Sequence, residues 1–301
     1  MGADDVLGAD DVLGHDDVLV VTTRSKLRSP RFFPQMMLAS TRIRRQLGRT
    51  SGVVRWASVV ASPTEFWTIT VWSSRHLMQE FMRSEEHGYI MWLFSKWLRS
   101  FWLMRWRPGQ REHGAWSDLT MSRRDTGGDA AGEHGTRAQR ELVDEMFAKM
   151  PYLRVAMGDD GIASYRDAPH VQQHRKQVEG AGGAVVRIET SPLRTPVALA
   201  DLRRQRDRLR TAPSLLGAAA GVGRPGEAYL LAVWSDRSAG ARLLEGGWAR
   251  DLRRRWGDGY WACEWLPENE FGHWDGRRLR RELRRHRAAR RRAAAAERVP
   301  R

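Results

Sequence analysis

The chain carries the same sequence pattern twice, about 160 residues apart. One copy reads Phe66-Trp67-Thr68-Ile69-Thr70-Val71-Trp72-Ser73, and the other reads Ala228-Tyr229-Leu230-Leu231-Ala232-Val233-Trp234-Ser235. Each copy is followed at a similar distance by a second matching segment, at 101–108 and at 260–267. A repeat of this length is too long for the units of a solenoid. The 301-residue chain therefore contains two equivalent globular units, and we interpret them as a duplicated domain.

Hydrophobic periodicity predicts the same order of elements, β-α-β-β-α-β, in both units. In the first unit we predict strands at 17–23, 53–61, 65–72 and 101–106 and helices at 32–47 and 74–93. In the second unit we predict strands at 184–189, 215–222, 228–234 and 260–265 and helices at 196–209 and 238–256. This is the ferredoxin-like order. Because each sheet has helices on one face only, the two sheets can cover each other. We predict an α+β fold in which two ferredoxin-like βαββαβ repeats pair as an intrachain dimeric α/β barrel, a monomeric pseudo-dimer.

Composition divides the chain into five segments. They are a repetitive N-terminal extension at 1–15, the first ferredoxin-like repeat at 16–119, a linker or insertion at 120–183, the second repeat at 184–276 and an arginine-rich tail at 277–301. The central segment opens with a glycine-rich run that is typical of flexible linkers, and it has no assigned role.

The net charge of +15 lies mainly in the tail, which has twelve arginines against Glu282 and Glu297. We interpret the tail as a nonspecific appendage, and its alternative role is contact with nucleic-acid phosphates or anionic lipid. We expect no other nucleic-acid binding.

A single cysteine, Cys263, fits a reducing compartment, and we expect a cytoplasmic protein. The most hydrophobic stretch, 89–103, is interrupted by Lys96 and Arg99. It is too short for a bilayer, so we expect no membrane span. The N-terminus has neither the basic region nor the apolar region of a signal peptide.

Two short motifs resemble ligand sites but lack the required context. Gly221-Val-Gly223-Arg-Pro-Gly226 has phosphate-loop spacing, yet a strand follows it rather than a helix, so we predict a hairpin turn. His170 and His174 are spaced as zinc ligands on a helix, but no third ligand accompanies them. We interpret them as solvated loop histidines, and we expect no metal site.

The fourteen tryptophans are the most distinctive side chains of the sequence. On the strand at 101–106, Trp102 and Trp106 share one face, while Phe101 and Leu103 share the other. The simpler interpretation is a core filled by tryptophan, and the alternative is an aromatic pocket for a large flat or polyene ligand. Some of these residues could serve both roles.

His87 is the one ionisable side chain that we select as a catalytic candidate. It lies on the second predicted helix of the first unit, beside Tyr89 and Trp92. The second unit has Trp248-Ala249-Arg250 at the corresponding place. If His87 is functional, only the first repeat holds a site and the second is its structural partner. The alternative is a solvated helix histidine.

Val71-Trp72-Ser73, followed by a helix with Phe81-Met82-Arg83-Ser84 and His87, resembles the antibiotic-biosynthesis monooxygenase group of the dimeric α/β-barrel superfamily. The segments 35–39 and 52–56 also resemble spheroidene monooxygenase. The group includes cofactor-independent oxygenases, haem-binding oxygenases and proteins without known activity. In its haem-degrading members the axial histidine comes one helical turn beyond His87, where this chain has Met91.

The resemblance implies a monooxygenase-like protein that acts on a hydrophobic small molecule. On this hypothesis His87 is the base or a haem ligand and Met91 could bind the cofactor, and the alternative is an activity without any cofactor. Trp67, Trp72 and Trp92 would line the pocket, and Arg75 would hold an anionic group. The alternative is a non-catalytic protein that binds a ligand or mediates assembly, so whether the chain is an enzyme stays open here.

Overall fold

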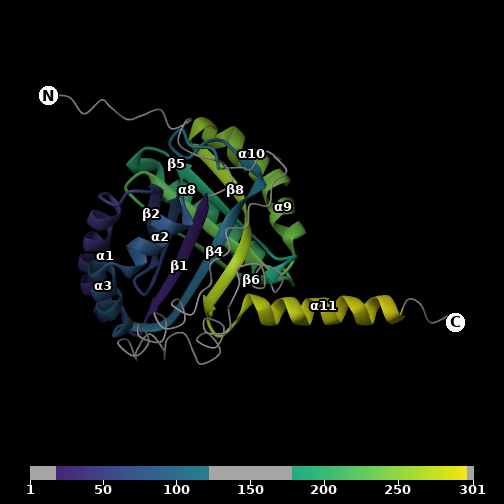
Figure 1. The fold of residues 1–301 in the computed structure, drawn as a ribbon. Helices are drawn as coiled ribbons and strands as arrows, with labels where there is room; N and C mark the ends of the chain where they lie inside the picture. The colour runs from purple at the N-terminus through teal and green to yellow at the C-terminus, as the bar shows by residue number, and fades with distance from the viewer. Residues whose placement is uncertain (1–17, 122–177, 297–301) are drawn as a thin grey trace.

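A computed structural model describes residues 18–121 and 178–296 of the chain (Figure 1). The predicted extension at 1–15, most of the predicted linker and the last residues of the tail lie outside the described residues. His170 and His174 lie outside them as well. The predicted α+β class is confirmed by strands and helices that alternate along both described parts.

The first half of the chain follows the order strand, helix, strand, strand, helix, strand. Its elements are β1 (Leu19–Leu27), the short 3₁₀ turn η1 (Pro30–Phe32), α1 (Phe33–Leu47), β2 (Val53–Ser62), β3 (Glu65–Trp72), α2 (Arg75–Arg83), α3 (Glu85–Ser95) and β4 (Leu98–His113). The predicted second helix is thus two helices. β4 extends well beyond the predicted strand at 101–106 and passes through Pro108.

The second half repeats this order. Its elements are β5 (Gly182–Glu189), η2 (Pro192–Arg194), α8 (Thr195–Leu209), β6 (Leu215–Val222), β7 (Glu227–Trp234), α9 (Arg237–Glu245), α10 (Gly247–Trp256), η3 (Gly257–Gly259) and β8 (Tyr260–Gly272). A last helix, α11 (Leu279–Ala296), follows β8. The glycine-rich motif at 221–226 joins β6 to β7 as a hairpin, as predicted, and Gly226 has the positive φ of 95° that its turn requires.

The eight strands of the described residues form one closed antiparallel sheet in the order β1-β3-β2-β6-β7-β5-β8-β4, and β4 returns to β1. The two halves meet at two seams. At one seam, β4 and β8 pair along most of their length, from Trp102 opposite Gly272 to His113 opposite Ala262. At the other, β2 and β6 share the single pair Val60 and Val222. The β4–β8 seam therefore supplies most of the backbone pairing between the halves.

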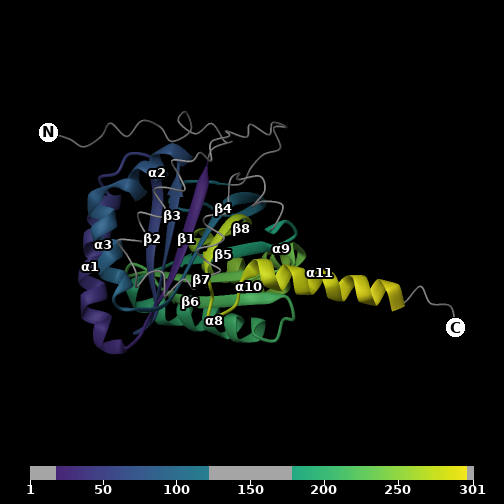
Figure 2. The same ribbon diagram turned by 60° about the horizontal axis from the view of Figure 1, so that its bottom comes forward.

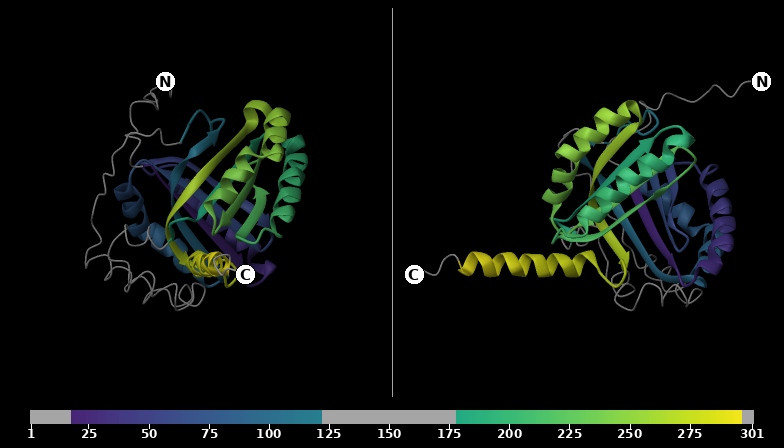
Figure 3. Two further views of the ribbon diagram at one scale, coloured as in Figure 1. Left: turned by 90° about the vertical axis from the view of Figure 1, so that its right-hand side faces the viewer. Right: turned by 180° about the vertical axis from the view of Figure 1, so that it is seen from behind.

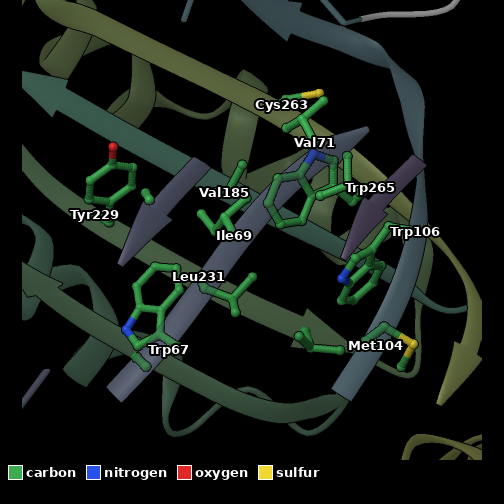
Figure 4. Close-up of a cluster of buried hydrophobic side chains, with 14 of the residues drawn as sticks. Trp67, Ile69, Val71, Met104, Trp106, Val185, Tyr229, Leu231, Cys263 and Trp265 are labelled. Carbon is green, nitrogen blue, oxygen red and sulfur yellow. The ribbon is translucent and has the colours of Figure 1, made fainter. Parts of the chain in front are cut away.

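Side chains alternate between the inside of the closed sheet and its outside. Trp102, Met104 and Trp106 point inward, while Phe101 and Leu103 point to the helices, in agreement with the faces predicted from the sequence. The inside holds side chains from both halves in one cluster (Figure 4). The helices lie outside, with α1 and α3 over the first half and α8 over the second (Figure 2).

Tryptophan and tyrosine rings fill the inside of the closed sheet. Inside the sheet, the rings buried to 1% exposure or less are those of Trp67, Trp102, Trp106, Trp116, Tyr229, Trp261 and Trp265. They contact one another edge to face or at a tilt, as between Trp116 and Trp261 (5.0 Å between ring centroids) and between Trp106 and Trp265 (5.9 Å). These residues form the common core of the two halves.

The buried Glu270 and the partly buried Glu112 form hydrogen bonds across the β4–β8 seam in opposite directions. The Glu270 side chain of the second half accepts a hydrogen bond from Trp102 Nε1 of the first half at 3.0 Å. The Glu112 side chain of the first half accepts one from Trp261 Nε1 of the second half at 2.7 Å. Each half thus satisfies the indole N–H that the other half buries.

The same reciprocity appears where each long strand ends. Gly114 (φ 75°) lies against Tyr260, and a Cβ there would stand 2.2 Å from the Tyr260 carbonyl oxygen. Gly272 (φ 73°) lies against Phe101, and a Cβ there would stand 2.1 Å from the Phe101 oxygen. Only glycine fits both the backbone angle and the close approach at these two positions.

No helix in the described part of the chain is both long and apolar enough to cross a membrane.

Replacing Gly272 by alanine should destabilise the protein more than the same replacement at Gly276. Both glycines have positive φ, 73° and 82°, but a Cβ at Gly276 would meet nothing within 4 Å. The difference in the free energy of unfolding, measured by urea denaturation, should be about 1–3 kcal/mol, since only Gly272 must also move the Phe101 backbone. Equal losses in the two variants would contradict the close contact at the seam.

Candidate functional site

The loop residues Ser74 and Ser84 define the two helices that carry the predicted site. The Ser74 side chain accepts a hydrogen bond from the Leu77 backbone N–H at 3.2 Å and starts α2. The Ser84 side chain accepts one from the His87 backbone N–H at 3.3 Å and starts α3. The chain therefore turns at Ser84, and this places His87 in the first turn of α3.

His87 is half-buried between α3 and α2. Its ring packs at a tilt on Phe81, with 4.5 Å between the ring centroids. Its Nδ1 atom is buried and has no hydrogen-bond partner. Burial lowers the pKa of His87 to about 4. The imidazole is therefore neutral at pH 7.

Trp72 and His87 meet through Phe81. Trp72 lies at the end of β3, and its ring contacts Phe81 with 5.2 Å between centroids. The Trp72 indole N–H donates to Thr70 Oγ1 at 2.8 Å, so it is satisfied within its own strand. Of the residues predicted for the pocket, Trp72 is the one that these ring contacts bring together with His87.

Trp92 and Met91 lie further along α3. Both are partly buried and pack against the outer cluster of the first half. The Trp92 ring stacks on Tyr89 with 6.1 Å between centroids, and Lys96 Nζ stands 3.2 Å from the centre of the Trp92 ring. Tyr89, Trp92 and Lys96 therefore form a cationic and aromatic cluster on the surface side of α3.

Trp67 and Arg75 lie apart from this group. Trp67 points into the closed sheet, where it meets Tyr229 edge to face at 6.1 Å. Arg75 Nη2 donates to the buried Glu268 of the second half at 2.5 Å, and Arg107 also pairs with Glu268 at 3.3 Å. The Arg75 guanidinium, which we predicted to hold an anionic group of the substrate, is thus already paired with a carboxylate of the second half.

The outer layers of the two halves differ in packing. In the second half, the layer consists mainly of Ala, Leu, Val and Ile, and most of its members are fully buried. In the first half, the layer contains Phe, Trp and Met, and many of its members are only partly buried. The partly buried ones are Phe32, Phe33, Met37, Ile43, Val53, Trp56, Val60, Met82, Met91, Trp92 and Trp97. Unbranched methionines and half-buried rings adapt to a guest more readily than tightly packed alanines.

A basic cavity of about 570 Å³ adjoins the start of α3. It is lined by Arg42, Arg45, Gln46, Arg49, Thr50 and Glu86. Gln46 fixes α1 to α3 at its edge by donating to Ser84 Oγ at 2.9 Å. Sequence reasoning missed this cavity, although Arg42, Arg45 and Arg49, spaced three and four apart at the end of α1 and just beyond it, are visible in the sequence.

Sequence reasoning also missed two buried arginines at equivalent places. Arg24 pairs with Glu65 at 2.6 Å in the first half, and Arg187 pairs with Glu227 at 2.9 Å in the second. Burial alone would raise the pKa of Glu227, but the hydrogen bond and charge of Arg187 lower it below its usual value. The strand register makes the two pairs equivalent, because Arg24 lies opposite Trp67 and Arg187 lies opposite Tyr229.

The residues around His87 do not form a haem pocket. The neutral imidazole with its unpartnered Nδ1 has suitable ligand chemistry. However, the ring packs directly on Phe81, and His87 does not line the adjoining cavity. A macrocycle would have to displace Phe81 before iron could reach the imidazole. Haem ligation by His87 or Met91 stays a prediction that the geometry does not favour.

No family model matches the chain, and no curated protein matches it. Solved structures similar to this chain include an anthrone oxidase-like protein (12% identity, 85% of this chain and 94% of that chain, TM-score 0.30). A conserved protein from Methanosarcina mazei matches at 14% identity over 31% of this chain and 94% of that chain, with a TM-score of 0.29. An antibiotic biosynthesis monooxygenase matches at 13% identity over 29% of this chain and 94% of that chain, with a TM-score of 0.28.

His87 should make stability depend on pH between about 6.5 and 4. The unfolded chain takes up a proton below about 6.5, whereas the buried imidazole resists protonation down to about 4. Its contribution is therefore complete above pH 6.5 and is lost as the pH falls, by up to about 3 kcal/mol. Urea denaturation of His87→Gln should show a shallower loss over this range. The exposed His76, 75% accessible, gives the control His76→Gln, which should retain the wild-type slope.

Adding haemin to the purified protein should produce no saturable Soret band. The reason is the contact of the His87 ring with Phe81. The measurement is an absorption titration of wild type and of Phe81→Ala, which removes the blocking ring. A saturable band in the wild type that His87→Ala abolishes would overturn this expectation.

Proposed function

We propose that the chain is a monooxygenase-like protein that takes a hydrophobic small molecule between the sheet and the helices of its first half. The observation that carries the proposal is the buried, unpartnered Nδ1 of His87 within a layer of half-buried rings and methionines. A mostly apolar small molecule with one polar group could hydrogen-bond to this nitrogen and pack against the adaptable apolar layer beside it. The second half, with its tightly packed layer, then serves as the structural partner.

We also propose that the chain is a duplicated ferredoxin-like domain, closed on itself as an intrachain dimeric α/β barrel of the antibiotic-biosynthesis monooxygenase type. The repeated element order supports this, as do the equivalent Arg–Glu pairs and the reciprocal Trp–Glu bonds at the seam. Reciprocal contacts of this kind are those of a two-fold symmetric dimer. The domain limits at 16–119 and 184–276 follow from the same proposal.

The proposed reaction needs a base rather than a cofactor. His87 Nδ1 would accept a proton from an acidic C–H or O–H of the guest, which leaves an electron-rich anion. The anion would transfer electrons to O₂, and a methylene group would become a carbonyl as O₂ is consumed and water is released. The protonated imidazole would return its proton to the oxygen atom that leaves as this water, which regenerates the base. The low pKa of His87 means that the base form is present at all pH values above about 4.

The alternative is a non-catalytic protein whose outer layer only holds the ligand. The lowered pKa favours this alternative, because an imidazole with a pKa of about 4 is a weak base. On either view Trp72 and Trp92 would contact the ligand. Trp67 would support the site from inside the sheet without contacting the ligand. Arg75 would hold the start of α2 in place through its ion pair with Glu268.

Oxygen uptake with anthrone, a flat tricyclic ketone with an acidic methylene group, separates the two functions. We expect uptake above the rate in buffer alone, with about 100-fold slower turnover in His87→Gln, since a positioned base contributes a factor of this order. Quenching of tryptophan fluorescence by anthrone should keep its midpoint in that variant. His76→Gln, an exposed histidine of α2, is the matched control and should retain the wild-type rate.

Equal oxygen uptake in wild type and His87→Gln would remove the catalytic role of His87. Saturable quenching without any oxygen uptake in the wild type would favour the non-catalytic alternative.

A further inference from the structure

The last helix, α11, projects away from the body of the protein. It runs from Leu279 to Ala296, and its distal part leaves the closed sheet and its helices behind (Figures 1 and 3). Leu279 and Leu283, at its start, are buried at 0% and 2% exposure in the interior cluster. Beyond Leu283 the helix continues for about 20 Å at the usual rise per residue. We call α11 the arm. Its root, residues 279–283, is fixed in the core, and its shaft is the part beyond Leu283.

The root of α11 is held by the seam between the two halves. Glu270 accepts hydrogen bonds from the backbone N–H of Leu279 at 2.8 Å and of Arg280 at 3.3 Å. The same carboxylate accepts from Trp102 Nε1 of the first half. A buried acidic group at a helix N-terminus satisfies its N–H groups and its dipole together. The direction of the arm is thus set by the core.

The shaft of α11 is densely basic. The helix has eight arginines and a single acidic residue, Glu282, which pairs with Arg285 at 3.1 Å. Five arginines beyond Leu283 have exposed side chains: Arg284, Arg285, Arg287, Arg291 and Arg292. At helical spacing, three of them form one row and two form a second row beside it. Like charges three and four residues apart repel one another, so an anionic partner would stabilise this helix.

We propose that α11 binds duplex DNA by lying in the major groove with its arginines on the phosphates, without sequence specificity. A polyanion matches the part of α11 beyond Leu283, which has two rows of arginines and no carboxylate in its sequence. The major groove of B-form DNA admits an α-helix, whereas the deep, narrow major groove of duplex RNA does not.

A membrane surface fits the arm less well. A helix that lies in a bilayer interface needs large apolar residues opposite its basic face. From Arg284 to Ala296 the sequence has only arginine, histidine and alanine, and the two leucines of α11 are already buried in the core. Beyond Leu283, α11 therefore has no large apolar side chains with which to enter lipid.

The test measures binding of the full chain to a short mixed-sequence DNA duplex by fluorescence anisotropy, from about 50 to about 200 mM salt. The test variant replaces five arginines by glutamine: Arg284, Arg285, Arg287, Arg291 and Arg292. The matched control replaces five exposed arginines of α8, its C-terminal turn and α10, namely Arg203, Arg208, Arg210, Arg250 and Arg254. Both variants lose the same charge. Circular dichroism confirms that each keeps the melting temperature of the wild type.

We expect the wild type and the control to bind with affinity that falls steeply with salt. In the α11 variant the slope of log K against log salt should be shallower by about 4, because each phosphate contact contributes about −0.9. An unchanged slope in that variant, or an equal loss in the control, would overturn the proposal. So would equal binding to duplex RNA, or binding to phosphatidylserine vesicles in place of DNA.

Discussion

The pairing of β4 with β8 is the contact on which the rest of the molecule depends. The other seam between the halves, β2 with β6, has one residue pair, so it cannot hold two sheets together by itself. Along the β4–β8 seam each half also supplies the carboxylate that the other half's buried indole requires. Leaving such a group unpaired in the interior costs about 1–3 kcal/mol. The two halves therefore stabilise each other through groups that neither could bury alone.

The same seam connects features that lie far apart in the sequence. Glu268 of β8 holds Arg75 at the start of α2, and Glu270 of β8 holds the start of α11. The buried carboxylate of Glu270 has a pKa raised by desolvation, although the backbone N–H groups of α11 and the Trp102 indole oppose that rise. One strand of the second half thus orients both the helix before the candidate site and the basic arm.

The two outer layers show how equivalent halves can take different roles. The second half has alanines and leucines at full burial under its helices, which is a tightly packed structural layer. The first half has methionines and aromatic rings at partial burial, with a neutral histidine among them. Because both halves share one interior, the tight half can stabilise a looser one. This division of roles is consistent with a single site in the first half.

Local sequence patterns predicted most of the fold. The hairpin strands β2, β3, β6 and β7 lie within one residue of their predicted ends, because β-branched and apolar runs bounded by turn residues are local signals. The inward and outward faces of β4 also followed from its alternation.

Contacts between the halves could not be predicted in this way. β4 and β8 continue beyond Pro108 and Pro267, where local rules end a strand, because each finds its partner in the other half. The break at Ser84 depends on a capping hydrogen bond that competes with a continuous helix. For His87, the sequence supplied the residue but not its environment. Its low pKa arises from burial by Phe81 and the surrounding layer, which only the assembled helices create.

Hydrogen exchange of the full chain under increasing urea tests most directly whether the two halves depend on one seam. Amides of Trp102–Trp106 in β4 and of Asn269–Gly272 in β8 lie opposite each other in the seam, so they should be released by a single opening reaction. We predict the same free energy of opening and the same urea dependence for both segments. If β4 opened at a free energy about 2 kcal/mol or more below that of β8, the halves would be independent domains, and the central role of the seam would be contradicted.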